Sequence, residues 1–236
     1  PQKVGVPNVD LTTGVYAALG IVAALLRRAQ TGQGEYIDVA MLDVQVGLLA
    51  NQAMNFLLGG RVPRRTGTAH PNIQPQRTFA CADGDIVIVV GNDAQFATLC
   101  EALGQPGLAR DPRYVSNSQR VKNLDTLDPL LDAIFIGEPR AHWLDLLKRA
   151  GVPAGSINTV PEVFEDPQVL HRGMLRHLPH PAAGEVPQVM NPLRFGQSAL
   201  RVDRAPALLG QHTDEGLGEL GLSAAQIRDY RNRKII

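Results

Sequence analysis

Asp10 is the residue whose type and setting point most directly to chemistry. It lies in the segment VDLTTG, directly before a stretch that apolar periodicity predicts to be a helix over residues 13–30. Aspartate is favoured at helix starts, where free backbone N–H groups and the macrodipole stabilise negative charge. On spacing alone, helix capping is therefore the leading interpretation. The alternative is a carboxylate nucleophile that forms a covalent intermediate, and the two roles are compatible.

Other polar residues give weaker signals. Gly32 and Gly34 resemble half of a dinucleotide-binding fingerprint, but they follow a predicted helix and precede a predicted strand, which reverses the required order. His177 and His180 are three residues apart, but Pro179 breaks any helix that would align them. No Cys or carboxylate cluster accompanies these histidines, so we expect no metal site.

The segment 59–75 is rich in Gly and Pro and is expected to be a linker or an ordered loop, a common location for functional side chains. Its His70 is, on position alone, an ordinary loop histidine. The basic residues of the same segment could meet phosphates, although local charge runs are more often simply solvated. They are Arg61, Arg64 and Arg65.

Hydrophobic periodicity and turn residues predict a mixed α/β chain. Helices are expected at 13–30, 43–58, 93–103, 124–136, 140–150 and 160–165, with a strand at 35–41, a hairpin formed by 77–81 and 86–90, and a strand at 152–158. Thr12 or Thr13 can cap the first helix, and Asn92 the third. Ser223 and Gln226 have the spacing of a capping box before a last helix.

Changes in residue composition along the sequence predict two domains. Residues 59–173 read as a linker followed by a small α+β domain, whereas prolines and short extended runs dominate from residue 174 onward. Residues 1–58 are too few to fold as an α/β layer by themselves. We therefore expect 1–58 and 174–236 to belong together in one larger domain.

The bulk composition excludes several classes of protein. The 23 basic and 23 acidic residues balance, which argues against a nucleic-acid binder. No uninterrupted apolar run reaches the roughly 18 residues of a membrane span, since Arg27 and Arg28 interrupt one of the longest. Cys81 and Cys100 are isolated and fit a reducing cytosol, so we expect a cytoplasmic protein. The chain opens PQKVGVPNVD, without Met or a signal-peptide pattern, and we expect it to begin inside a larger protein.

Four stretches, in order and covering nearly the whole chain, resemble the class III CoA-transferases, the CaiB/BaiF or formyl-CoA-transferase family. They are VDLTTGVYAALGIVAALLRRAQTGQGEYIDVAMLD at 9–43, GTAHPNIQPQRTFACADGDIVIVVGNDAQFATLCEALG at 67–104, GVPAGSINTVPEVFEDPQVLHRGM at 151–174, and NPLRF at 191–195 with APALLGQHTDEGL at 205–217. The resemblance is greatest to the succinate- and glutarate-type branch.

The resemblance implies a Rossmann-like large domain built from both ends of the chain, an inserted small α+β domain, and an interlocked homodimer. It implies that most of the CoA-binding residues lie upstream of Pro1. Asp10 matches the position of the family's catalytic aspartate, which would carry the acyl group during transfer of CoA between an acyl-CoA and a carboxylic acid. His70, Asn72 and Gln74 match a substrate loop that is glycine-rich in formyl-CoA transferase. Coenzyme A would be a substrate, with no tightly bound cofactor.

Two alternatives remain at this point. An α-methylacyl-CoA racemase shares the fold and uses the same aspartate position as an acid or base. Its loop sequence GAPFY is absent here, and HPNIQP stands in its place, which favours a transferase. The third possibility is an inactive structural or dimerisation fragment.

Overall fold

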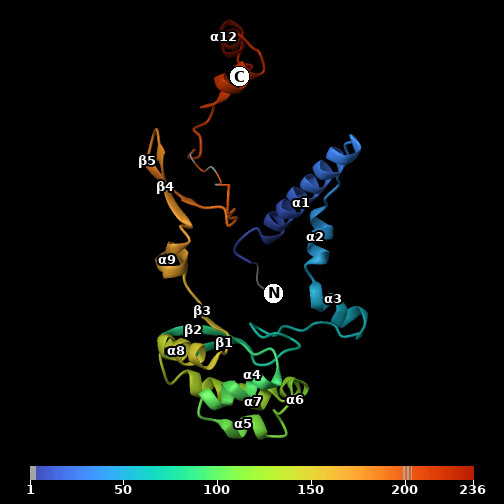
Figure 1. Ribbon diagram of the computed structural model, residues 1–236, viewed down its shortest axis with the longest axis vertical. Coiled ribbons are helices and arrows are strands. Elements are labelled where there is room, and N and C mark those ends of the chain that lie inside the picture. The colour runs from blue at the N-terminus through green and yellow to red at the C-terminus, as the bar shows by residue number, and fades with distance from the viewer. Residues whose placement is uncertain (1–3, 199, 201, 203) are drawn as a thin grey trace. The chain divides into compact units, whose positions relative to one another are not determined.

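The computed structural model describes residues 4–198, 200, 202 and 204–236. The chain divides into two compact units, Pro1–Gly155 and Ser156–Ile236. The described residues form helices and small antiparallel sheets (Figure 1), so the predicted mixture of α and β structure is confirmed. The grouping of 1–58 with 174–236 into one domain stays a prediction.

The first helix begins earlier than predicted. Helix α1 spans Asn8–Thr31, with Pro7 at its N-cap, and the Pro7 carbonyl accepts a hydrogen bond from the Leu11 N–H. Thr12 and Thr13 therefore lie inside the helix and do not cap it. Their hydroxyls donate to carbonyls one turn back, at 2.7 Å each, which is the usual bond of a threonine within a helix. The predicted end is confirmed, because Gly32 adopts a left-handed conformation with φ 73°.

The segment after α1 differs from the prediction. Residues 35–40 form no strand, since no neighbouring segment of the described chain supplies the hydrogen bonds that a strand requires. The single helix expected at 43–58 is two shorter helices, α2 (Met41–Gly47) and α3 (Ala50–Leu57). The break falls where Ala50 adopts a positive φ of 44°. Periodicity alone did not reveal this break because the apolar spacing continues across it.

Helix α1 leaves its apolar side chains exposed. Val15, Leu19, Val22 and Leu26 recur on one face as the sequence predicted, and each remains more than 60% exposed within this chain. By length and composition alone, α1 is also apolar enough to cross a membrane, although Asp10 and Arg27 bound its uninterrupted apolar run. A core helix of a soluble protein and a signal sequence both satisfy that criterion. The exposed apolar face shows that α1 finds no covering partner among the described residues.

The best-packed part of the first unit is a small α+β module. Strands β1 (Gln76–Cys81) and β2 (Gly84–Val89) form the predicted antiparallel hairpin, and β3 (Ala154–Ser156) extends the sheet beside β2. The hairpin turn is centred on Ala82 and Asp83, one residue before the expected Asp-Gly pair, because Cys81 pairs with Gly84. The accompanying helices are α4 (Asp93–Ala102), α5 (Pro106–Arg110), α6 (Asn117–Lys122), α7 (Leu124–Phe135) and α8 (Arg140–Ala150).

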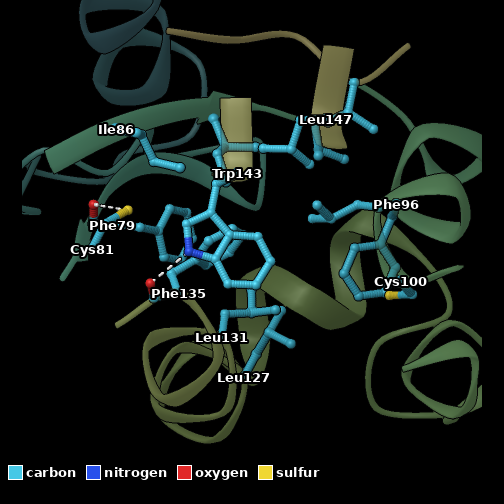
Figure 2. Packing of buried hydrophobic residues seen from close by; sticks show 14 of the residues in the cluster. Phe79, Cys81, Ile86, Phe96, Cys100, Leu127, Leu131, Phe135, Trp143 and Leu147 are labelled. Carbon is cyan, nitrogen blue, oxygen red and sulfur yellow. Dashed lines mark hydrogen bonds between the residues drawn. The ribbon is translucent and has the colours of Figure 1, made fainter. Parts of the chain in front are cut away.

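One hydrophobic core holds this module together (Figure 2). The Phe135 ring lies 4.7 Å from the Phe79 ring and 5.0 Å from the Trp143 ring, in the tilted and edge-on arrangements that aromatic pairs prefer. The Trp143 indole N–H donates to the Phe135 carbonyl at 2.8 Å, so this buried polar group is satisfied. The predicted cap of α4 is confirmed, since the Asn92 side chain accepts from the Gln95 N–H.

The second unit contains a further hairpin and several short helices. The predicted helix near 160–165 is present, and the predicted Ser223–Gln226 capping box is confirmed at the start of the last helix. The elements are α9 (Val160–Glu165), α10 (Pro167–His171), β4 (Leu175–His180), β5 (Gly184–Val189), α11 (Thr213–Glu219) and α12 (Ala224–Asn232).

Candidate active site and substrate loop

Asp10 lies within the first turn of α1, as its third residue, and not before the helix as predicted. The N-cap position belongs to Pro7, so Asp10 is not the capping residue. Its side chain is exposed and has no hydrogen-bond or ion-pair partner in the part of the chain that the structure describes. The first-turn position still favours a negative charge, by about 0.3–1 kcal/mol, through the helix dipole. Asp10 therefore presents an accessible carboxylate that no internal contact occupies.

His70 is held by its own loop. Its backbone N–H donates to the Gln76 carbonyl at 2.8 Å, and its ring Nδ1 accepts from the Asn72 N–H at 3.1 Å. With Nδ1 as an acceptor, the neutral ring carries its proton on Nε2. His70 lines a shallow pocket of about 290 Å³ together with Gln76, Arg77 and other loop residues. The ring is thus half-buried and fixed in orientation at the edge of β1.

Asn72 faces a different pocket. Its side-chain amide forms a reciprocal pair of hydrogen bonds with the amide of Asn55 on α3, at 3.1 and 3.3 Å. Both asparagines line a pocket of about 560 Å³ that also contains Arg61 and Arg64. The pair joins the segment 70–74 to α3 and forms one wall of this pocket.

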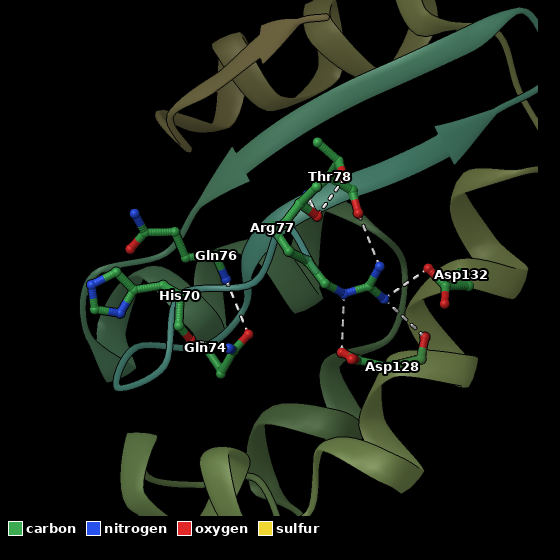
Figure 3. A network of polar contacts seen from close by, with 8 residues as sticks. His70, Gln74, Gln76, Arg77, Thr78, Asp128 and Asp132 are labelled. Atoms are coloured by element: carbon green, nitrogen blue, oxygen red, sulfur yellow. Dashed lines mark hydrogen bonds and ion pairs between the residues drawn. The ribbon is translucent and has the colours of Figure 1, made fainter. Parts of the chain in front are cut away.

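Gln74 is buried, with 1% of its surface exposed, and both ends of its amide are used within the loop. Its Nε2 donates to the His70 carbonyl, and its Oε1 accepts from the Gln76 N–H at 3.3 Å, a contact visible in Figure 3. This arrangement suits a residue that shapes the loop from inside. Contact of Gln74 with a substrate stays a prediction.

A buried arginine anchors the loop to the helical module. The Arg120 side chain is fully buried and donates to the Gln74 carbonyl at 2.7 Å, the Tyr114 carbonyl at 2.9 Å and the Asp93 carboxylate at 2.8 Å. Its guanidinium also lies over the Phe96 ring, 4.4 Å from the centroid. Because each of the three guanidinium nitrogens donates a hydrogen bond, the backbone at Gln74 is held in one position.

Asn117, the first residue of α6, provides a second anchor. Its Oδ1 accepts from the Gln74 N–H at 3.0 Å, and its Nδ2 donates to the Asn72 carbonyl at 2.8 Å. Its own N–H donates to the Asp93 carboxylate at 2.8 Å. One asparagine therefore fixes both faces of the 72–74 backbone, and Asp93 links this anchor to Arg120.

Arg77, which follows Gln76 on β1, forms a network of ion pairs with two aspartates of α7 (Figure 3). Arg77 bonds to Asp128 at 3.1 Å and to Asp132 at 2.7 Å, and its guanidinium lies 3.9 Å from the centroid of the Phe79 ring. Burial raises the pKa of the Asp128 carboxyl above its usual value, although Arg77 opposes the shift. These contacts tie β1 to α7 and serve the fold of the module, because the charge of Arg77 is already balanced.

The structure thus separates the predicted site residues. His70 and Asn72 line different pockets, Gln74 is internal, and none of the described pockets that contain them includes Asp10. Among the described residues, no group of three His, Cys, Asp or Glu side chains could hold a metal ion. The anchoring roles of Arg120 and Asn117 were not predicted, since a lone Arg and a lone Asn on a short helix give no signal of burial in the sequence pattern.

Comparison with known proteins gives a consistent result. The family model described as CoA-transferase family III matches residues 1–213. The chain is 40% identical over 220 residues to the succinate–glutarate CoA-transferase of Agrobacterium fabrum, covering 93% of the chain and 55% of that protein. It is also 40% identical to the human succinyl-CoA:glutarate CoA-transferase, covering 93% of the chain and 50% of the relative.

A solved structure agrees with these sequence matches. The crystal structure of a CaiB/BaiF family protein from Brucella suis is 44% identical and superposes with a TM-score of 0.75, covering 93% of this chain and 57% of that one. The chain spans about half the length of the curated relatives it matches.

Proposed function

Because the chain belongs to CoA-transferase family III, we propose that the protein transfers coenzyme A from an acyl-CoA donor to a carboxylic acid, with Asp10 as the covalent nucleophile. The match of the family model over residues 1–213 carries this proposal. Relatives at 40% identity are named for succinate and glutarate, so we propose dicarboxylic acids as the substrate class. The names of these relatives favour transfer over the racemase alternative.

The chemistry assigned to Asp10 proceeds through two kinds of acyl intermediate. The Asp10 carboxylate attacks the donor thioester, expels CoA thiolate and becomes a mixed anhydride. The thiolate then attacks the aspartyl carbonyl, which releases the donor acid and leaves an aspartyl-CoA thioester. The acceptor carboxylate displaces the thiolate, and the thiolate finally attacks the acceptor carbonyl and frees Asp10. Each bond broken thus matches a bond formed, without a redox step.

The position of Asp10 supports this role. Its carboxylate is exposed and without internal partners, so no contact must break before it attacks. A helix N-terminus stabilises the carboxylate that the last step regenerates. A carboxylate is a weak nucleophile, and the reaction therefore depends on holding the thioester close and aligned. We further propose that this alignment is completed in an interlocked homodimer, in which the exposed face of α1 is covered.

Hydroxylamine trapping tests the nucleophile. The protein is incubated with succinyl-CoA and hydroxylamine, and peptides are analysed by mass spectrometry for a hydroxamate on Asp10. The Asp10→Asn variant should form no adduct. Its rate of CoA transfer to glutarate should fall at least a thousandfold, since no other group replaces the nucleophile.

Asp43 provides a matched control, because it is also the third residue of its helix, α2, and is also exposed. Asp43→Asn should keep both the adduct and the activity. Full transfer activity in Asp10→Asn would sink the assignment. Exchange of the α-proton without transfer of CoA would instead support the racemase.

A further inference from the structure

The pocket between α3 and the segment 61–72 is lined by polar side chains that are either cationic or neutral. It measures about 560 Å³, within the usual range for small-molecule sites. The lining contains two guanidinium groups, three amides and a hydroxyl, and no carboxylate. These polar residues are Gln52, Asn55, Arg61, Arg64, Thr66 and Asn72.

The turn after α3 places Arg61 beside Asn55, which lines the same pocket. Gly60 adopts φ 64°, a left-handed conformation that suits glycine, and its N–H donates to the Phe56 carbonyl at 2.9 Å. The next N–H, that of Arg61, donates to the Asn55 carbonyl at 3.2 Å. Arg61 is therefore fixed by its backbone next to the residue whose amide pairs with Asn72.

The two arginines of the pocket are unpaired among the described residues, like Arg65 beside them and unlike three other arginines of the first unit. Arg77 and Arg120 form ion pairs with aspartates, as does the exposed Arg113. Arg61 and Arg64 form no ion pair with any residue that the structure describes. A guanidinium fork matches the oxygens of a carboxylate or phosphate, and amide and hydroxyl donors nearby can complete such a site.

We propose that this pocket binds an oxyanion through Arg61 and Arg64, with Asn55 and Asn72 as its preformed wall. The proposal deepens the function proposed above and rests on it for the source of the ligand. One source is the second carboxylate of a dicarboxylic acid, which stays ionised while the first reacts. The other source is a phosphate of coenzyme A. Both present the same chemistry to the two arginines.

Direct binding measurements test the pocket independently of catalysis. The protein is titrated calorimetrically with glutarate and, separately, with inorganic phosphate, and the Arg61→Gln and Arg64→Gln variants are compared with the unaltered protein. Loss of one charge-assisted contact should weaken the preferred anion about five- to tenfold in each variant. Pocket-dependent binding of glutarate supports the carboxylate source, and pocket-dependent binding of phosphate supports the CoA source.

Arg65 supplies the control, since it lies in the same exposed loop and carries the same charge but does not line the pocket. Arg65→Gln should change binding less than twofold. Equal losses in all three variants, or no loss in Arg61→Gln and Arg64→Gln for either anion, would overturn the proposal. Circular dichroism checks that each variant is folded. Asp10→Asn should bind both anions normally, so failure of the pocket is distinguishable from failure of the proposed reaction.

Discussion

Residues 76–152 and helices α1–α3 are both rich in apolar side chains, yet the first region buries them and the second leaves most of them exposed. In the first region, Leu131 and Phe135 on α7 are completely buried against β1 and α8. In the second, Leu19 on α1 is 64% exposed, and no residue of α1 is buried. An amphipathic pattern therefore shows that a face is suited to burial, whereas the partner that buries it must be found elsewhere.

The largest test of this contrast compares the same truncation in the two regions. Leu131→Ala should lower the free energy of unfolding by about 2–5 kcal/mol, because it removes buried methyl groups and leaves a cavity. Leu19→Ala should change it by less than about 0.5 kcal/mol while the chain is monomeric, as expected of an exposed site, and by more in the homodimer proposed above, which covers this face of α1. Urea unfolding followed by tryptophan fluorescence reports on the core through Trp143, the sole tryptophan. Equal losses in the two variants would show that α1 is buried in solution.

A second test concerns the polar anchor of the core region. Arg120→Met should destabilise the protein by about 2–4 kcal/mol, since the carbonyls of Gln74 and Tyr114 would lose their buried donor. Arg113→Met removes an arginine that is largely exposed and paired with Asp111, and should cost far less than the loss of Arg120. Thermal unfolding measures both. A similar, small cost for both variants would mean that the loop is not held by Arg120.

A third test uses pH to probe the same interior. Burial raises the pKa of the Cys100 thiol to about 11, against the opposing effect of the Arg120 guanidinium. Since the folded pKa lies above the unfolded one, the contribution of the neutral thiol is complete below pH of about 9 and is lost as pH rises toward 11. Between pH 8 and pH 10.5, the free energy of unfolding should therefore fall by about 2 kcal/mol more in the unaltered protein than in Cys100→Ala. An identical fall in both would contradict the burial of this thiol.

The smallest test compares two glycines. Gly151 ends α8 with φ 74°, so Gly151→Ala should destabilise the core region by about 1 kcal/mol. Gly14 lies within α1 in open space, and Gly14→Ala should strengthen that helix by about 0.5–1 kcal/mol. Circular dichroism during thermal unfolding measures both changes. Destabilisation by Gly14→Ala would indicate that another surface packs closely at that point of α1.

The sequence was most informative where a local rule determines the structure. Asn92 and Ser223 begin helices through bonds within a few residues, and both caps were predicted. The prediction of a strand at 35–41 was wrong because a strand needs a pairing partner elsewhere in the chain, and residue spacing within the segment does not reveal whether one exists. The burial of Arg120 could not be predicted for the same reason, since its acceptors lie 6 to 46 positions away in the chain. The candidate nucleophile Asp10 came from resemblance, and its place inside α1 came from the structure.

The exposed run from Arg61 to Arg65 has a consequence for how the chain responds to a protease. It contains three arginines, has no helix or strand, and lies upstream of the point where Arg120 and Asn117 fasten the backbone at 72–74. Trypsin cleaves after arginines in such accessible segments. The cut would separate α1–α3 from a remainder that keeps every residue of the hydrophobic core. The boundary between the two contrasting regions is thus also a segment where trypsin is expected to cut the first unit.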